Sequence, residues 1–143
     1  MNVEERNHLT PMIDVTCAII VNQAKQVLIT QRSATMKLPF KWEFPGGKVE
    51  SGESPEACVV REIKEELNLD INPGMTLQLS IHHYPEFSIN LIPFICEIMG
   101  GEIILSEHTQ YLWLDPAELL NLDWAEADIP IVKNYIELIK IEL

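Results

Sequence analysis

Basic residues are scarce in this chain of 143 residues. Ten lysines and arginines stand against 22 aspartates and glutamates, which gives a formal net charge of −12. Proteins that bind the phosphate backbone of nucleic acids need clustered lysine and arginine. The charge therefore argues against a nucleic-acid polymer as a partner. A free nucleotide is compatible with it where a metal ion supplies the positive charge.

Cysteines are few, and long apolar runs are absent. Cys17, Cys58 and Cys96 are odd in number, lie in apolar stretches and lack the paired spacing of a metal site. We expect all three to be reduced core residues. The first residues include neither a basic leader nor an apolar run, and eighteen apolar residues never follow one another. These features predict a soluble cytoplasmic protein that does not bind a membrane.

Internal repeats and low-complexity segments are also missing. The length suits one domain, which we expect over residues 12–143. A flexible polar tail is expected at residues 1–11. A monomer and a homodimer are both compatible with the sequence.

Acidic residues are present in one unusually regular group. The pattern is Gly47, five residues, Glu53, seven residues, Arg61-Glu62-Ile63, one residue, Glu65-Glu66, two residues and Leu69. The fixed positions would coincide by chance in a chain this long about once in a million trials. An acidic solvated helix is the plainer alternative.

The middle of this group has the features of a helix. Ser54 is a suitable N-cap, and Pro55 follows it at the one helical position where proline is favoured. Val60, Ile63 and Leu67 recur at the spacing of one buried stripe.

Three carboxylates should share a different face of this helix, because Glu65 and Glu66 follow Glu62 after three and four residues. Like charges so placed repel by about 0.2–0.5 kcal/mol per pair, and a hard divalent cation would relieve the repulsion. Magnesium binds carboxylates, keeps several waters and bridges to substrate phosphates. Arg61 would either orient a catalytic carboxylate or form a surface ion pair.

The segment from Gly47 to Leu69 resembles the signature box of the Nudix hydrolases. One position differs, because Asn68 stands where the family usually has glycine. Asparagine tolerates the left-handed conformation at a helix C-terminus, so the difference should cost little stability. The resemblance implies an α/β fold, the Nudix α/β/α sandwich, in which a mixed β-sheet lies between helices.

Strands are predicted at residues 13–21, 26–30, 103–105 and 111–114, and two further apolar segments follow the box at residues 75–84 and 88–98, separated by the break at Pro85-Glu86. The first two should form a hairpin around a turn at 22–25, and Pro45-Gly46-Gly47 should form a tight turn. A short helix is predicted after Asp115. A last helix should begin near Ile129 and bury Ile131 or Val132, Tyr135, Ile136 and Ile139.

The resemblance covers about residues 12–140, and the MutT-like nucleoside triphosphate pyrophosphohydrolases look most similar, through the segments 43–48 and 127–130. In such enzymes magnesium holds the triphosphate while a water attacks phosphorus, and the products are a nucleoside monophosphate and pyrophosphate. The resemblance implies metal ligands at the carbonyl of Gly46 and at Glu62, Glu65, Glu66 and Glu107. Mg²⁺ is the expected ion, with Mn²⁺ as an alternative. Taken alone, Glu107 is interpreted as a surface residue.

The same resemblance implies further catalytic roles. Glu53 would support the metal ligands, Arg61 would orient a carboxylate, and Lys48 would neutralise phosphate charge. Glu62 would lie nearest the attacking water. Ionisation of that water by the metal would make a strong general base unnecessary.

The resemblance implies that a second set of residues binds the nucleotide and recognises its base: Arg32, Glu43, Phe44, Pro45, Gly46 and Asp128. Asp128 has an equally strong alternative as the N-cap of the last helix. As an ionised carboxylate it would only accept hydrogen bonds, which favours guanine or cytosine derivatives.

Aromatic and histidine side chains have plainer interpretations. Trp42 and Trp124 are candidates for stacking on the base, although tryptophan in a small domain is more often a core residue. His82, His83 and His108 lack a third metal ligand at a suitable spacing, so we interpret the first two as strand residues and His108 as a loop residue.

These residues predict magnesium-dependent hydrolysis of a small nucleotide, an oxidised guanine or a cytidine triphosphate. Another Nudix substrate class, such as dinucleoside polyphosphates, sugar nucleotides or NADH, is the near alternative, but an added recognition motif for it is missing. A non-catalytic nucleotide-sensing module on the same fold would have lost carboxylates from the box, and none is lost.

Overall fold

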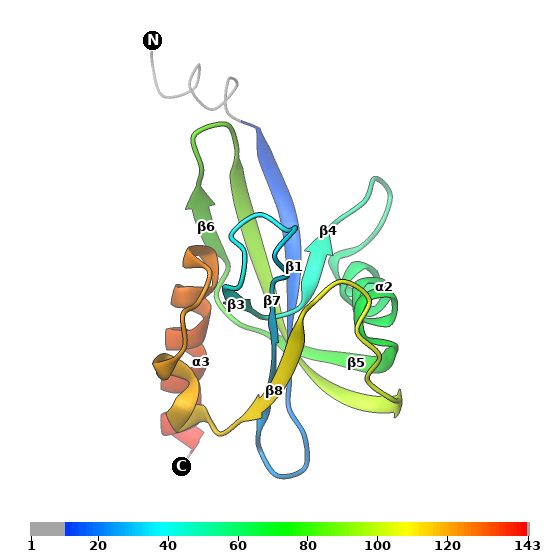
Figure 1. The fold of residues 1–143 in the computed structure, drawn as a ribbon, viewed down its shortest axis with the longest axis vertical. Coiled ribbons are helices and arrows are strands. Elements are labelled where there is room, and N and C mark those ends of the chain that lie inside the picture. Colours follow the sequence, from blue (N-terminus) through cyan, green and yellow to red (C-terminus); the bar gives the residue numbers. More distant parts are fainter. Residues whose placement is uncertain (1–10, 143) are drawn as a thin grey trace.

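The computed structural model describes residues 11–142, which form two sheets flanked by helices (Figure 1). The five-stranded sheet contains β1 (Met12–Ile20), β4 (Gly46–Lys48), β5 (Leu69–Thr76), β6 (Ser80–His83) and β7 (Ser88–Gly101). The three-stranded sheet contains β2 (Val27–Gln31), β3 (Trp42–Glu43) and β8 (Gln110–Leu114). The helical segments are α2 (Pro55–Leu67), α3 (Ile129–Glu142) and the 3-10 helices η1 (Pro116–Asn121) and η2 (Glu126–Asp128). The predicted α/β class is confirmed.

Most of the tail expected at residues 1–11 lies outside the described residues. Pro11 is described, and its carbonyl accepts a hydrogen bond from the amide of Ser88 at 2.8 Å. Within residues 11–142, none of the helices combines the length and the apolar character that crossing a membrane requires.

Strand β1 forms the middle of the larger sheet. It pairs in parallel with β7, from Met12 opposite Ser88 to Ile20 opposite Cys96, and antiparallel with β4 on its other edge. Strands β5 and β6 both pair antiparallel with β7. The predicted mixed sheet is therefore present, and β4 brings Gly46 and Gly47, at the start of the box, against β1.

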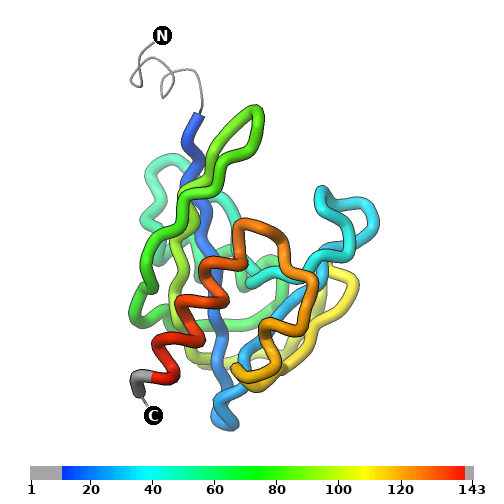
Figure 2. Tube along the Cα trace, turned by 90° about the vertical axis from the view of Figure 1, so that its left-hand side faces the viewer, coloured from blue at the N-terminus to red at the C-terminus, as the bar shows by residue number. Residues whose placement is uncertain are grey.

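The two faces of this sheet are covered by different helices, with α2 on one side and α3 across the other (Figures 1 and 2). Successive side chains of a strand point to opposite faces. Cys17 and Ile19 accordingly belong to the core beneath α3, whereas Ala18 and Ile20 belong to the core beneath α2. One strand thus supplies both halves of the hydrophobic interior.

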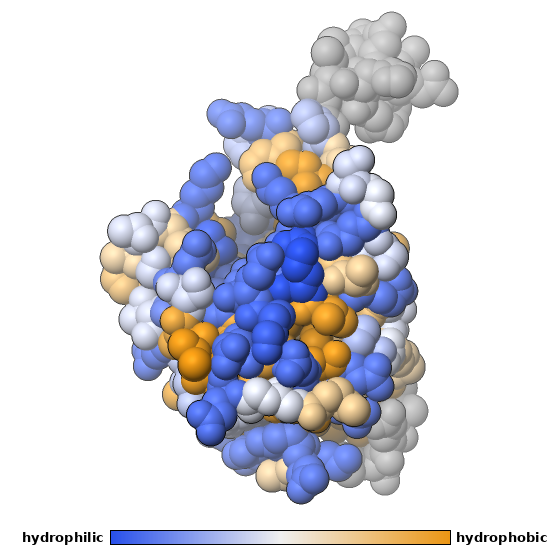
Figure 3. Space-filling view, turned by 90° about the vertical axis from the view of Figure 1, so that its right-hand side faces the viewer, coloured by the Kyte–Doolittle hydropathy of each residue, from blue (hydrophilic) through white to orange (hydrophobic). Residues whose placement is uncertain are grey.

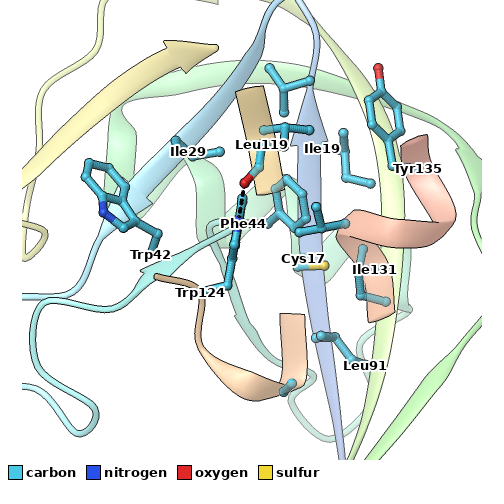
Figure 4. Close-up of a cluster of buried hydrophobic side chains, with 13 residues drawn as sticks. Cys17, Ile19, Ile29, Trp42, Phe44, Leu91, Leu119, Trp124, Ile131 and Tyr135 are labelled. Carbon is cyan, nitrogen blue, oxygen red and sulfur yellow. Dashed lines mark hydrogen bonds between the residues drawn. The ribbon is translucent and has the colours of Figure 1, made fainter. Parts of the chain in front are cut away.

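The core on the α3 side contains Trp42 and Trp124 (Figure 4). Trp42 is 8% exposed and Trp124 is 5% exposed. The Trp124 ring lies 4.9 Å from the ring of Phe44, and its Nε1 donates a hydrogen bond to the Leu119 carbonyl at 2.6 Å. The interpretation as core residues is confirmed for both tryptophans.

Helix α2 begins and ends at the predicted residues. Ser54 Oγ accepts a hydrogen bond from the Ala57 amide at 3.1 Å, and Asn68 adopts the left-handed conformation with φ 60°. The buried stripe differs from the prediction, because Val59 lies in the core whereas Val60 is 37% exposed. Both residues are compatible with the helical period, and the packing of α2 against the sheet selects Val59.

Strands β1 and β2 do not form the predicted hairpin. The turn at 22–25 is present, and Val21 and Val27 on its two sides form an isolated antiparallel bridge. Beyond this bridge β1 and β2 belong to different sheets. Both edges of β1 are already paired, with β4 and β7, so β2 pairs with β3 and β8 instead.

Two shorter predictions are also wrong. Gly46 and Gly47 belong to β4 rather than to a tight turn, because a strand without side chains can approach β1 closely. Residues 103–105 are not a strand. The Ile104 and Ser106 amides instead donate to the carbonyls of Leu67 and Glu66, which would otherwise lack partners at the end of α2.

Several smaller predictions are confirmed. Cys17, Cys58 and Cys96 are buried and unpaired. His82 and His83 lie in β6. The final helix begins at Ile129, and its buried residues are Ile131, Val132 and Tyr135, with Ile136 and Ile139 packed against the same core.

Asn68 gives a test of the helix end. Its left-handed conformation costs an ordinary L-residue about 1–2 kcal/mol, so we expect Asn68→Ala to lower the free energy of unfolding by about 1 kcal/mol. Asn68→Gly gains backbone freedom but loses the hydrogen bond from Nδ2 to the Glu102 carbonyl at 3.1 Å. It should therefore change stability by less than about 0.5 kcal/mol. Urea unfolding measures both, and equal losses would contradict this account.

Candidate active site

Glu62 and Glu66 lie on the side of α2 that faces β4. The Glu62 side chain is 16% exposed, and burial raises the pKa of its carboxyl. Glu66 has a buried Oε2 atom without a hydrogen-bond partner among the described residues. Burial raises the pKa of Glu66 to about 9, and the negative charges of Glu43 and Glu62 add to this effect. Glu66 therefore requires a proton or a cation near neutral pH.

The third carboxylate of the row differs in exposure. Glu65 is 60% exposed, and it accepts a hydrogen bond from Arg61 Nη1 at 3.3 Å. Glu62 accepts a hydrogen bond from the same Arg61 nitrogen at 3.0 Å. Glu65 is more exposed than Glu62 and Glu66, so the three carboxylates of the row differ in burial. Within residues 11–142, no three Asp, Glu, His or Cys side chains form a group that could hold a metal ion.

Arg61 lies inside the box rather than apart from it. Its Nε and Nη2 donate to the two carboxylate oxygens of Glu53 at 2.7 and 3.0 Å, and Nη1 donates to Glu62 Oε1 at 3.0 Å. This fork holds the pKa of Glu53 at about 2. Nη2 also donates to the Lys48 carbonyl at 3.3 Å. The contacts agree with an orienting role, because one guanidinium fixes two carboxylates and the end of β4.

The two glycines of β4 permit this close packing. A β-carbon at Gly47 would stand 2.3 Å from the carboxyl carbon of Glu62. At Gly46 it would stand 2.0 Å from the carbonyl oxygen of Thr16 in β1. Gly47 therefore makes room for a functional side chain, and Gly46 makes room for the neighbouring strand.

A cavity of about 600 Å³ opens beside the box. Gly46, Lys48 and Glu66 line it next to α2, and Phe44 and Asp128 line it next to α3. Its remaining walls are mostly apolar and come from the sheet, from the loop after β2 and from the turn between β6 and β7. A volume of this size suits a small organic ligand.

The turn between β6 and β7 gives the cavity an aromatic wall that the sequence did not indicate. Tyr84 and Phe87 both line the cavity, and their ring centroids are 5.0 Å apart. They flank the Pro85-Glu86 break, where no periodic pattern marks a side chain as functional.

Asp128 connects the start of α3 with the segment after β3. Its Oδ2 accepts a hydrogen bond from the Phe44 amide at 2.9 Å. Burial raises the pKa of Asp128 to about 8, and the negative charge of Glu43 contributes. This long-range bond gives Asp128 a role different from that of a helix N-cap. Because Asp128 also lines the cavity, a ligand there can contact it.

Glu43 is held by two partners in a position that lines the cavity. Arg32 Nη1 donates to its Oε1 at 2.7 Å, and His108 Nε2 lies 2.8 Å from its Oε2. His108 was interpreted as an ordinary loop residue. It does lie in a loop, but its side chain is 1% exposed. A single histidine in a polar segment has no spacing that would have revealed this contact.

The structure thus divides the predicted site residues into three groups. Those that line the cavity are Arg32, Glu43, Phe44, Gly46, Lys48, Glu66 and Asp128. Those packed beside the cavity at the base of the box are Glu53, Arg61 and Glu62. Glu65 and Glu107 are exposed, and Pro45 is buried with its carbonyl bound to the Ala18 amide at 2.8 Å.

The surface on the α2 side agrees with this division. Hydrophilic side chains cover the middle of this face, with apolar patches beside them (Figure 3).

Comparisons with known proteins agree with this geometry. Residues 11–135 match the NUDIX domain family. The chain is 35% identical to the CTP pyrophosphohydrolase of Escherichia coli, over 89% of this chain and 93% of that protein. It is 31% identical to the 8-oxo-dGTP diphosphatase of Escherichia coli, over 84% and 93%.

A similar structure is the MutT protein from Methanosarcina mazei, with a TM-score of 0.80, 26% identity and coverage of 93% of this chain and 96% of that one. The family match spans most of the chain, including the box, β1 and the first half of α3. The protein therefore belongs to the Nudix family and is a hydrolase.

Proposed function

We propose that this hydrolase converts a nucleoside triphosphate into a nucleoside monophosphate and pyrophosphate with the help of magnesium. Glu66 carries the proposal, because it lines the same cavity as Lys48 and Asp128 and its buried Oε2 has no hydrogen-bond partner among the described residues. A polyphosphate with its cation would satisfy the carboxylate, and the nucleoside would occupy the apolar part of the cavity. The relatives named for CTP and 8-oxo-dGTP support this substrate class.

The proposed metal ligands are Glu62, Glu66 and the Gly46 carbonyl, with Glu65 and Glu107 at the exposed rim. Magnesium is commonly held by one or two carboxylates together with substrate phosphates and waters. The unpartnered oxygen of Glu66 and the neighbouring Glu62 fit that requirement without a complete protein cage. When bound, the ion supplies positive charge to the polyphosphate and to the attacking water.

Other side chains would position the substrate. Lys48 is exposed beside the glycines and would neutralise phosphate charge in a protein of net charge −12. Arg61 would keep Glu53 and Glu62 in fixed orientations. Arg32 and the residues from Glu43 to Gly46 would border the nucleotide. Tyr84 and Phe87, rather than the buried tryptophans, would offer the stacking surface for the base.

Asp128 is proposed to read the edge of the base. Because burial raises its pKa to about 8, we propose that Asp128 carries a proton at pH 7, so that it both donates and accepts, as an amide does. The expectation of an accept-only aspartate is therefore revised. A neutral carboxyl group can donate one hydrogen bond and accept another, so it pairs with a base edge that has a donor next to an acceptor. Cytosine presents such an edge at N4 and N3, and guanine oxidised at C8 presents one at N7 and O6, so both remain the proposed substrates.

The overall proposal predicts the outcome of a nucleotide panel with magnesium. CTP, dCTP, dGTP and 8-oxo-dGTP are compared with ADP-ribose, NADH and a dinucleoside polyphosphate, and pyrophosphate is scored against orthophosphate. We expect pyrophosphate from a triphosphate, and at least about a hundredfold lower kcat for Glu62→Gln and Glu66→Gln in folded protein.

The control is Glu56→Gln, an exposed carboxylate in the first turn of the same helix, which should leave the rate unchanged. Orthophosphate as the product, turnover confined to the other nucleotide derivatives, or near-normal rates in both Glu62→Gln and Glu66→Gln would overturn the proposal.

The glycine pair gives a matched test of the box geometry. At Gly47 an added β-carbon meets the flexible Glu62 side chain, whereas at Gly46 it meets backbone of β1. Gly47→Ala should therefore fold and displace Glu62, with kcat lower by at least about tenfold. Gly46→Ala should lose at least about 2 kcal/mol of unfolding free energy. A fully active Gly47→Ala protein would show that the position of Glu62 does not matter.

The protonation of Asp128 can be tested without metal or turnover. Titration calorimetry gives the Kd of the monophosphate product between pH 6.5 and 9. Because deprotonation above pH 8 removes the donor, wild-type binding should weaken about tenfold per pH unit there. Asp128→Asn should bind within about threefold of wild type at pH 7 and stay nearly constant at high pH. The same weakening in both proteins would reject the role of this proton.

A further inference from the structure

His108 is a deeply buried polar residue in an exposed loop. Its side chain is 1% exposed, whereas the neighbouring Glu107 and Thr109 are exposed. Histidine is usually only partly buried, and a buried polar ring needs hydrogen-bond partners. The partner of Nε2 is Glu43 Oε2 at 2.8 Å, from a residue 65 positions earlier in the chain.

Three elements of the smaller sheet converge on the Glu43 carboxylate. Glu43 ends β3, Arg32 follows β2, and His108 precedes β8. Strand β2 lies between the other two strands, with Thr30 opposite Glu43 and Gln31 opposite Gln110. The Thr109 amide donates to the Gln31 carbonyl at 3.0 Å, which fixes the loop beside His108. The contact is therefore built into the register of the sheet.

Both oxygens of Glu43 are occupied by these partners. Arg32 Nη1 is bound to Oε1 at 2.7 Å, and His108 lies at Oε2. A carboxylate accepts hydrogen bonds, so the proton of the imidazole ring belongs on Nε2. The Nδ1 atom is buried and has no partner among the described residues. The ring is thus placed by one hydrogen bond, to Glu43.

Glu43 lines the cavity between its two buried acids. Its negative charge raises the pKa of Glu66 and also that of Asp128. Its side chain is 15% exposed, so its charge is only partly screened by water. A rotation of this carboxylate would change the field at the proposed phosphate site and at the proposed base site together.

We infer that His108 is a positioning residue, which holds the Glu43 carboxylate against Arg32 so that the nucleotide cavity keeps its shape and charge pattern. This role rests on the proposed function, because it assigns Glu43 to the binding of the nucleotide. Glu43 would contact the substrate, and His108 would act through Glu43. The loop before β8 would thereby take part in recognition without touching the ligand.

The test compares His108→Leu with His108→Gln in the full-length protein. Glutamine can place a donor near the position of Nε2, whereas leucine cannot. Loss of a hydrogen bond to a charged group should raise KM for the preferred triphosphate at least about fivefold, with kcat within about twofold. His108→Gln should stay within about twofold of wild type in both parameters.

A double-mutant cycle with Glu43→Gln separates positioning from packing. If His108 acts through Glu43, His108→Leu should add less than about twofold to KM in the Glu43→Gln protein. The matched control is Gln110→Leu, which removes the 2.7 Å hydrogen bond from Gln110 in β8 to Gln31 in β2 but leaves Glu43 untouched. It should not change KM.

A spectroscopic measurement tests the same contact without catalysis. ¹⁵N NMR of the ring nitrogens should show the Nε2–H tautomer for His108 in the wild-type protein. The opposite tautomer, equal KM for His108→Leu and wild type, or an equal rise of KM in His108→Leu and His108→Gln would overturn the inference. Absence of triphosphate turnover in wild type alongside the Nε2–H tautomer would reject the proposed function and the role of His108 in it, while leaving the contact with Glu43 established.

Discussion

Gly47 lies so close to Glu62 that a β-carbon there would stand 2.3 Å from the carboxyl carbon. This contact between α2 and β4 is the constraint on which the site depends. Strand β4 can serve as a platform because it pairs with β1, and β1 is held on its other edge by β7. The packing of α2 on its hydrophobic core then holds Glu62 directly against Gly47, which has no side chain.

The same packing removes two acids, Glu66 and Asp128, from most of their contact with water. The pKa of Glu66 is raised to about 9 and that of Asp128 to about 8, from ordinary values of 4.5 and 3.8. Above the ordinary values an unfolded chain releases these protons while the folded protein keeps them. These two acids therefore make stability fall as the pH rises from about 4 toward 8 or 9. A cation bound at Glu66 would offset part of this loss of stability. Buried acids that destabilise the empty protein are a feature of a binding site rather than of a core optimised for stability.

Local features of the box could be predicted well. Ser54, Pro55 and Asn68 begin and end α2 as expected, because caps depend on hydrogen bonds within one helical turn. The period of α3 likewise identified Ile131, Val132 and Tyr135. The prediction of Val60 as buried was wrong, because two neighbouring residues can satisfy the same period and the sheet selects between them. The hairpin of β1 and β2 was wrong because a local turn does not show that both edges of β1 are occupied.

The sequence by itself determined the family resemblance, the helix of the box and the residues proposed to bind a metal ion and phosphate, since these follow from spacing along a short segment. Only the tertiary structure decided which carboxylates are buried, which aromatic residues line the cavity and which residues hold one another in place. Asp128 meets the Phe44 amide across 84 residues, and His108 meets Glu43 across 65. Contacts over such separations depend on how the two sheets and α3 pack, and no local pattern records them.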